Sequence, residues 1–509
     1  MAFKEIQLKL PSDYSDDLLR DMIRKSLGIK DFTFHLIHKS LDARNKSNIH
    51  WLVRVAIFSP QLKGENPPAE PTLEIIHKKR KQKILVVGSG PAGFFSALAL
   101  LKAGFEVVII ERGSDVQKRS EGILNFESNG VFDAQSNYAF GEGGAGTFSD
   151  GKLTSRSKHI SKEKRFILEN YVAAGAPEEI LYLTHPHLGT DNLKKIVQKL
   201  REDFILAGGE MFFECMFRDF IIEKGKIIAA ATSNGIFEAD YFVIAPGHSA
   251  FETYRMLMKN GIPFRTKNFA IGFRAEHPQE IINKAQWGVE QLRGVKAAEY
   301  RLTSNPQNAL PVYTFCMCPG GVVVPATAYA DTNIVNGMSY YQRNGNFANA
   351  ACVAAVHPDR LLGKTATALE TLDWLENLEK SFFDFTGNYD APACKIQDFI
   401  QRKDSKKLPK SSYPFALREA RLWEMLPKQV SDSIRLSLQE FNRKIKGYET
   451  GILLGLESKT SAPIQVLRNE NGHVEGFRNL YIIGEGSGYA GGIISSAADG
   501  LRVVGRLMG

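Results

Sequence analysis

Residues 84–111 read ILVVGSGPAGFFSALALLKAGFEVVIIE. The continuous apolar run 84–87 is typical of a buried parallel strand, and the Ala- and Leu-rich segment 94–104 is typical of a helix. A second apolar run, 106–110, ends directly before Glu111. This order of strand, Gly-x-Gly-x-x-Gly, helix, strand and acid predicts the βαβ unit that binds a dinucleotide.

Each glycine of the motif has its own expected role. Gly88 allows the tight turn after the strand, Gly90 lets a pyrophosphate approach the backbone, and Gly93 lets the helix lie close to its strand. The helix directs the positive end of its dipole at the phosphates. Glu111 is placed to accept hydrogen bonds from both ribose hydroxyls of an adenosine.

Two further stretches fit the same glycine spacing. Residues 141–146 follow no apolar strand and precede no helical pattern, and residues 486–491 precede a helix that starts late. Neither has the context of a dinucleotide fingerprint. The sequence therefore predicts one dinucleotide-binding domain, whereas stable sites for both a flavin and a nicotinamide nucleotide usually require two.

The end of the chain indicates which dinucleotide binds. Residues 479–483 form a strand-like run, Gly484 and Glu485 follow, and a glycine-rich helix start lies at 491–500. This order resembles the second FAD motif of glutathione-reductase-like flavoproteins. The resemblance implies that Glu485 holds the ribityl chain and that the helix N-terminus points its amides at the flavin pyrimidine. Positive charge at that point would stabilise reduced flavin.

An intermediate segment completes the resemblance. Residues 239–247 are similar to the strand that ends in Ala-Thr-Gly in that superfamily, with Pro246 where Thr is usual. We expect a noncovalent FAD held by three separated stretches of chain. The sequence leaves open whether NADH, NADPH or neither is a transient co-substrate.

Longer motifs point to a narrower family, and the resemblance to it runs from the N-terminal module to the C-terminus. They are FGEGGAGTFSDGKL (140–153), PHLGTDNL (186–193), FRAEHPQ (273–279), FCMCPGGVVVPA (315–326), NGMSYYQR (336–343) and GYAGGIISSAADGLRVV (488–504). Together they resemble a largely uncharacterised bacterial family labelled FAD-dependent, or NAD-utilising, dehydrogenases. The resemblance implies FAD and an architecture, and little about mechanism.

We expect an α/β fold in which the Rossmann-type FAD-binding domain is discontinuous, at 84–250 and 456–509. A mixed-sheet α+β substrate or cap domain is inserted at 251–455, and residues 61–83 form a linker behind a small N-terminal β-α-β-β module at 1–60. The insert has strand-like runs at 269–276, 312–318, 321–327, 333–340 and 352–356, and helical patterns in 364–380 and 414–446.

The charge of the chain is concentrated in the linker. The 509 residues carry 64 Lys and Arg against 56 Asp and Glu, a net charge of +8. Residues 1–83 hold +6 of this (16 − 10), and 78–83 supply five positive charges. We favour a solvated linker over an RNA contact, because no aromatic and basic alternation accompanies it. We expect no specific nucleic-acid partner.

The chain has no apolar segment long enough to span a membrane and no signal-peptide pattern, so we expect a cytoplasmic protein without membrane contact. Its five cysteines include no C-x-x-C pair, which argues against a metal site or a disulfide framework. Residues 84–214 contain no cysteine. This excludes a disulfide reductase of the glutathione-reductase type, which carries its redox pair there.

Candidate catalytic residues are less well defined. Cys316 and Cys318 face one side of an expected strand and could form a redox pair or simply fill the strand face. We favour packing, since alternate residues of a strand lie about 6.5–7 Å apart at Cα, at the far edge of disulfide geometry. His248 follows the 239–247 strand and is a candidate acid or base.

Other titratable residues have structural alternatives of equal or greater weight. His185 and His187 could transfer protons or hold a loop, and four residues could bind an anionic substrate or form internal pairs. These four are Arg274, Glu276, His277 and Arg343. The candidate FAD contacts are Gly88, Gly90, Pro91, Ala92, Gly93, Glu111, Arg112, Gly144, Ala145, Thr147, Lys152, Met216, Gly247, Gly484, Glu485, Gly491, Gly492 and Ile493.

The functional hypothesis is an FAD-dependent oxidoreductase. It would transfer a hydride between NAD(P)H or an organic small molecule and flavin N5, in a direction that the sequence leaves open. The alternatives are a flavin-containing, tRNA-modifying type of RNA-associated protein and a flavin sensor without turnover. The sequence does not indicate the substrate or the oligomeric state.

Overall fold

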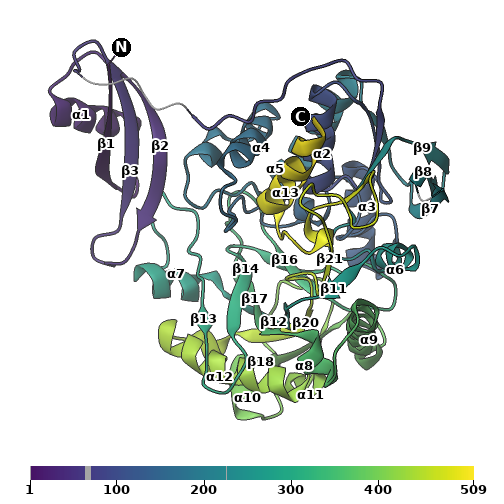
Figure 1. Ribbon diagram of the computed structural model, residues 1–509. Coiled ribbons are helices and arrows are strands. Elements are labelled where there is room, and N and C mark those ends of the chain that lie inside the picture. The colour runs from purple at the N-terminus through teal and green to yellow at the C-terminus, as the bar shows by residue number, and fades with distance from the viewer. Residues whose placement is uncertain (1, 64–69, 225, 509) are drawn as a thin grey trace.

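The computed structural model describes residues 2–63, 70–224 and 226–508. Its N-terminal module has the β-α-β-β order that the sequence predicted. β1 (Ala2–Pro11), β3 (His50–Ser59) and β2 (Thr33–Asp42) form an antiparallel sheet in that order, and α1 (Asp16–Leu27) packs on one face. Lys39 of β2 joins the module to the rest of the molecule through backbone hydrogen bonds with Tyr182 and Thr184. Figure 1 shows the module standing beside the main body.

A parallel sheet lies at the centre of the nucleotide-binding half. In the described chain it has the strand order β22-β10-β4-β5-β6. The strands are β4 (Lys83–Val87), β5 (Glu106–Ile110), β6 (Glu210–Phe212), β10 (Tyr241–Ile244) and β22 (Leu480–Ile482). β4 therefore pairs with β10 on one side and β5 on the other, so the three separated stretches meet in one sheet as predicted.

Both faces of this sheet are buried, which explains why its strands are continuous apolar runs. One face packs on α2 (Pro91–Lys102), α4 (Ser161–Ala173), α5 (Gly189–Leu206) and α13 (Ile493–Met508). The other packs on an antiparallel sheet of β7 (Phe217–Glu223), β8 (Lys226–Thr232) and β9 (Gly235–Glu238), which the sequence analysis did not predict.

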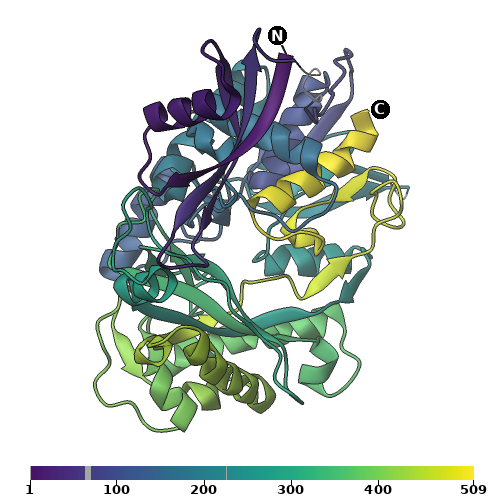
Figure 2. The same cartoon turned by 90° about the vertical axis from the view of Figure 1, so that its left-hand side faces the viewer.

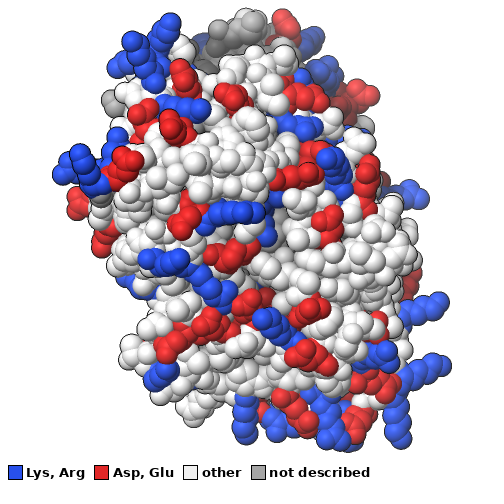
Figure 3. Space-filling view, turned by 90° about the vertical axis from the view of Figure 1, so that its right-hand side faces the viewer, with Lys and Arg blue, Asp and Glu red and all other residues white. Residues whose placement is uncertain are grey.

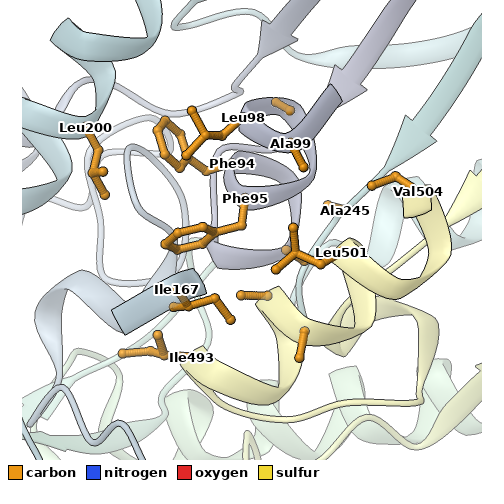
Figure 4. Packing of buried hydrophobic residues seen from close by; sticks show 14 of the residues in the cluster. Phe94, Phe95, Leu98, Ala99, Ile167, Leu200, Ala245, Ile493, Leu501 and Val504 are labelled. Carbon is orange, nitrogen blue, oxygen red and sulfur yellow. The ribbon is translucent and has the colours of Figure 1, made fainter. Parts of the chain in front are cut away.

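Helices α2 and α13 lie side by side although they come from opposite ends of the domain (Figures 1 and 4). Phe95 of α2 points toward Ile167 of α4, and Leu501 and Val504 of α13 line the same core (Figure 4). A Cβ atom on Gly500 would lie 2.7 Å from the carbonyl oxygen of Ala92. The small residue lets the two helices approach closely.

A large mixed sheet forms the second half, as expected. Over the described residues its order is β13-β14-β17-β12-β20-β18-β19. The strands are β12 (Phe269–Pro278), β13 (Thr303–Ser304), β14 (Val312–Cys318), β17 (Phe347–Val356), β18 (Ala391–Lys395), β19 (Leu417–Glu419) and β20 (Ile452–Glu457). A separate ribbon pairs β15 (Val322–Pro325) with β16 (Val335–Met338).

Helices pack against the large mixed sheet. They are α7 (Gln279–Trp287), α8 (Pro358–Leu362), α9 (Ala368–Thr386), α10 (Ile396–Gln401), α11 (Leu422–Met425) and α12 (Lys428–Lys444). Figure 2 shows the green ones (α8–α12) below its strands. The helical pattern predicted across 414–446 was wrong in part, because 417–419 form β19 and Pro427 separates α11 from α12. Proline lacks the N–H that a continuous helix would need there.

Two passages of chain connect the halves. After β10, α6 (Phe251–Lys259) packs on the parallel-sheet side through Leu257. β11 (Phe264–Thr266) then pairs antiparallel with β21 (Ile464–Val466) on the return passage. The division expected at 250 precedes α6, and the one expected at 455 falls inside β20. Shorter elements are α3 (Val116–Asn129), η1 (Ala145–Phe148), η2 (Glu178–Leu181), η3 (Tyr448–Thr450) and η4 (Glu485–Ser487).

The described part of the linker runs along the nucleotide-binding half. Lys78 and Arg80 donate backbone hydrogen bonds to Ala103 and Gly104, and the Arg80 side chain bonds the Met508 carbonyl and covers the Phe105 ring. Arg80 thus binds the protein itself. Positive and negative side chains alternate over the face shown in Figure 3. In the described chain, every helix is too short or too polar to cross a membrane.

Candidate active site

The first glycine loop connects β4 to α2 with close backbone packing. Gly88 has φ of 98°, and a side chain on it would overlap the Ala245 carbonyl. A Cβ on Gly93 would overlap the Gly88 carbonyl oxygen. These two glycines are therefore needed for the turn and for helix–strand contact, the roles predicted for them.

Gly90 is different, because its surroundings are open. It is the N-cap residue of α2, and a Cβ on it would have the Cα atom of Gly144 as its nearest described neighbour, at 3.7 Å. Pro91 begins the helix and donates no hydrogen bond. Two glycine backbones thus face one another beside a helix N-terminus, the type of surface that accepts a pyrophosphate.

The carboxylate of Glu111 lies at the end of β5 and is bound by its own surroundings. One oxygen accepts from the amide and hydroxyl of Ser89, and the other accepts from the amides of Gly113 and Gly141. A carboxylate has about four acceptor positions. A ribose hydroxyl at Glu111 must therefore replace one of these donors, and the Ser89 hydroxyl is the one free to rotate.

A buried arginine that the sequence analysis missed shapes the second glycine-rich segment. Arg119 of α3 is fully buried, and its guanidinium donates to the carbonyls of Asn137, Tyr138, Glu142 and Gly144. It thereby fixes the chain that presents Gly144 to Gly90. Nothing in the local sequence distinguishes Arg119 from a surface residue of a helix.

The C-terminal stretch lies against the same region. Gly484, with φ of 73°, lies against Ala92 of α2, and the buried Ile493 would meet a Cβ on Gly146 at 3.0 Å. A Cβ on Gly247, Gly491 or Gly492 would have no described atom within 4 Å. Gly491 and Gly492 thus face open space at the start of α13, and Gly247 has open space beside it as well.

Most of the predicted cofactor residues therefore converge. Gly88–Gly93, Gly144–Thr147 and Gly484–Ile493 surround one region, and burial raises the pKa of Glu485 there to about 7. Cys215 bonds the Glu111 carbonyl, which places Met216 near Glu111. Arg112 points elsewhere: it pairs with Glu252 at 2.5 Å and stacks on Phe140. The open glycine surfaces and the helix N-termini fit an FAD.

Asp150 joins the two halves of the molecule. Arg343, from the large-sheet half, binds its carboxylate through two nitrogens at 2.5 and 3.0 Å, and Ser339 donates to it as well. Lys152 pairs with Asp150 at 2.7 Å and also bonds the Met317 carbonyl. Burial works to raise the pKa of Asp150, but Arg343 and Lys152 outweigh it and hold the pKa far below its usual value.

The structural interpretations of several polar residues are confirmed. Arg274 forms an ion pair with Glu457 at 2.8 Å and Arg343 forms one with Asp150, whereas Glu276 accepts a hydrogen bond from the Ser412 amide at 3.1 Å. His187 bonds the Tyr341 carbonyl, and burial lowers its pKa to about 4. His277 bonds the Tyr448 carbonyl.

Two histidines remain candidates for proton transfer. His185 is exposed and bonds Glu299 at 2.5 Å through Nδ1. Neither ring nitrogen of His248 has a hydrogen-bond partner among the described residues, and burial lowers its pKa to about 3. A neutral His248 would accept a proton only weakly near pH 7, so its catalytic role stays a prediction.

No group of three or more His, Cys, Asp or Glu side chains in the described chain is arranged to hold a metal ion. All five cysteines are free thiols. Four are buried, and Cys316 is partly exposed.

Comparisons with known protein families agree with this geometry. Residues 81–128 match an FAD binding domain, and residues 268–460 match the family described as "FAD-dependent protein, C-terminal domain-like". Residues 2–58 match a domain of unknown function. The two FAD-related matches cover the first glycine loop and the large mixed sheet.

An uncharacterised protein of Clostridium beijerinckii (strain ATCC 51743 / NCIMB 8052) is 38% identical over 525 residues, which cover 99% of this chain and 98% of that protein. Among solved structures, L-proline dehydrogenase from P. horikoshii matches with 13% identity and a TM-score of 0.35, over 84% of this chain and 94% of that one. Glycine oxidase from Bacillus cereus matches with 11% identity and a TM-score of 0.33, over 84% and 95%. TM-scores this low do not bear on function.

Proposed function

The chain belongs to a family of FAD-dependent proteins, and on that premise we propose that it is an FAD-dependent oxidoreductase acting on a small molecule. The observation that carries the proposal is the convergence of Gly90, Gly144 and the start of α13 around one open region. FAD bound there would accept or supply a hydride at N5. The partner in that transfer is NAD(P)H or an organic substrate.

The residues of this chain have separate tasks in binding. Gly90 and Gly144 offer backbone to the pyrophosphate, and the N-terminus of α2 contributes its positive end. Gly491 and Gly492 expose the start of α13, which would favour negative charge on a neighbouring ring. Glu485 is placed to hold the ribityl hydroxyls.

The large mixed sheet supplies the substrate side. Lys152 and Arg343 lie at the seam between the halves, and both are compensated by Asp150 and Glu299. This region can orient a polar substrate by hydrogen bonds without an unpaired charge. We propose that a nicotinamide nucleotide, if it is the electron donor, binds transiently across this face.

The proposal is tested by purifying the protein and measuring its flavin. We expect noncovalent FAD that heat or acid releases. Gly90→Val should remove it, because a branched side chain would occupy the space that the pyrophosphate needs. Gly505→Val is a matched control: it lies in α13, and a Cβ there would meet no described atom within 4 Å. Colourless wild-type protein that does not bind added FAD would refute the proposal.

The electron donor is a separate question. Anaerobic stopped-flow mixing with NADH and with NADPH, followed by flavin absorbance, should show rapid bleaching by the true donor. If neither bleaches the flavin, the proposed nicotinamide step is wrong and an organic substrate must be the donor.

A further inference from the structure

Strand β14 carries a bulge at Cys316. Phe315 pairs with Ala351 of β17 and Cys318 pairs with Asn349, so Cys316 and Met317 together face a single residue of β17. Cys316 has φ of 45°, in the left-handed region. Glycine is the usual residue at such a bulge position, because a side chain there costs about 1–2 kcal/mol. The chain thus retains a thiol where backbone geometry favours its absence.

The two thiols are in contact. Cys318 Sγ lies 3.3 Å from the Cys316 carbonyl oxygen, to which the Cys318 thiol donates, and the side chain of Cys318 is also the strongest influence on the pKa of Cys316. Cys318 is fully buried, whereas Cys316 is partly exposed. The regular strand spacing that favoured simple packing does not hold at this bulge. Cys316 is thus the member of the pair whose residue borders the surface, and Cys318 is the protected one.

A buried guanidinium lies next to the pair. Arg274 Nη2 is 2.7 Å from the Cys316 carbonyl oxygen and 3.4 Å from Cys318 Sγ. Its other nitrogens bond Glu457, Asn349 and Asn336. Gly337 leaves room for this group, because a Cβ there would overlap the guanidinium. The arginine is held in place and can stabilise negative charge on sulfur.

The environment gives the two thiols different pKa values. The hydrogen bond from Cys318, followed by the positive charges of Arg274 and Lys152, lowers the pKa of Cys316 to about 6. The same hydrogen bond and burial raise the pKa of Cys318. A low-pKa, partly exposed thiol beside a protected one is the arrangement of an attacking and a resolving cysteine.

The pair also adjoins the cofactor walls. Lys152, in the glycine-rich segment that faces α2, bonds the carbonyl of Met317 between the two cysteines. Burial is the main cause of the raised pKa of Glu485, and charge on Cys316 raises this pKa further. The thiols thus lie where the large mixed sheet meets the glycine-rich segment that contains Lys152.

We propose that Cys316 and Cys318 form a redox-active dithiol that exchanges two electrons with the flavin and, through Cys316, with a disulfide-containing substrate. The inference rests on the proposed flavin function. Oxidation breaks two S–H bonds and forms one S–S bond, and the two electrons and two protons pass to oxidised flavin. In the opposite direction, reduced flavin restores the dithiol. Cys316 then attacks the substrate disulfide and Cys318 releases it, so that the substrate leaves as two thiols.

The test begins with an anaerobic reductive titration of oxidised holoprotein. FAD alone accepts two electrons, so the wild type should take up four per FAD and Cys318→Ser should take up two. Cys352→Ala is the matched control: it removes a buried thiol of the neighbouring strand β17 and should leave the value at four. A wild-type titration that ends at two electrons would overturn the inference while leaving the FAD proposal intact.

A second measurement avoids dependence on the variant and on flavin. Protein freed of FAD is treated with a mild disulfide oxidant, and the peptide containing residues 316–318 is weighed. Loss of two hydrogen atoms within that peptide is expected, and an unchanged mass would overturn the inference. Before oxidation, alkylation of Cys316 by iodoacetamide should rise around pH 6 and should require higher pH in Arg274→Gln. Failure of the FAD proposal would appear separately, as protein without flavin that still forms the disulfide.

Discussion

The two sides, or walls, of the candidate site are formed by different kinds of chemical group. The wall around α2 and α13 consists of glycine backbone and helix ends, whereas the wall from the large mixed sheet consists of charged side chains and thiols. Backbone surfaces bind a cofactor through shape and amide dipoles, and they do not titrate. The side-chain wall is stabilised by ion pairs and hydrogen bonds between its members. Loss of one charged partner therefore leaves the other charge buried and unpaired. The two walls should therefore respond differently to substitution and to pH.

The largest expected effect on stability is a difference between substitutions at two glycines of the same loop. Gly93→Ala should lower the free energy of unfolding by more than about 4 kcal/mol, since its Cβ would overlap the Gly88 carbonyl. Gly90→Ala should leave stability within about 1 kcal/mol and weaken FAD binding. Urea unfolding and FAD titration measure the two quantities. Equal stabilities of the two variants would show that helix–strand contact does not require Gly93.

The seam between the walls gives the next effect. Asp150→Asn removes the carboxylate that compensates Arg343 and Lys152, and we expect a loss of about 3–5 kcal/mol in the free energy of unfolding. Asp21→Asn is a suitable control, because Asp21 pairs with Arg24 at the surface and such pairs contribute about 1 kcal/mol or less. A loss of less than about 1 kcal/mol for Asp150→Asn would mean that the buried pair does not hold the halves together.

The contrast also explains what the sequence could predict. The backbone wall depends on short-range patterns: Gly88, Gly90, Gly93 and Glu111 carry their spacing in one continuous stretch, and the parallel sheet follows from it. The side-chain wall depends on residues far apart. Arg274 contacts Cys318, which is 44 residues away in the sequence, and Glu457, which is 183 residues away. No spacing rule predicts such contacts.

Two predictions show the same limit. Packing of the cysteine pair was favoured on the geometry of a regular strand, and the register shift between β14 and β17, which breaks that geometry, exists only once the sheet is assembled. The role of the pair stays a prediction. The helical pattern at 414–446 was extended through Pro427 although proline there ends one helix and starts another. The first could not be predicted from local sequence; the second could have been.

The helix-covered face of the large mixed sheet should also make stability depend on pH. His277 is fully buried beside Tyr448, and burial lowers its pKa from 6.5 to about 4. Between these values the unfolded chain binds more protons than the folded protein. The contribution of His277 to stability is therefore complete above about pH 6.5 and is lost as pH falls toward 4, by up to about 3 kcal/mol.

His277→Gln should remove that part of the pH dependence, measured by urea unfolding at steps between pH 4 and 7. His35→Gln, at an exposed position of β2, should leave the profile unchanged. If His277→Gln and the wild type lose stability in parallel, another buried group must account for the slope.

The smallest effect concerns the Ser89 side chain in the wall around α2 and α13. The Ser89 hydroxyl fills an acceptor position of Glu111 that a ribose hydroxyl would use. Ser89→Ala removes that hydrogen bond and should cost about 1 kcal/mol of stability, because the Ser89 amide still bonds the carboxylate. FAD affinity should stay the same or increase, since the freed position is open to the ribose. Ser96→Ala is the control, as Ser96 Oγ has no partner among the described residues and its removal should cost nothing. Weaker FAD binding by Ser89→Ala alone would mean that the hydroxyl contacts the cofactor directly and that Glu111 acts through it.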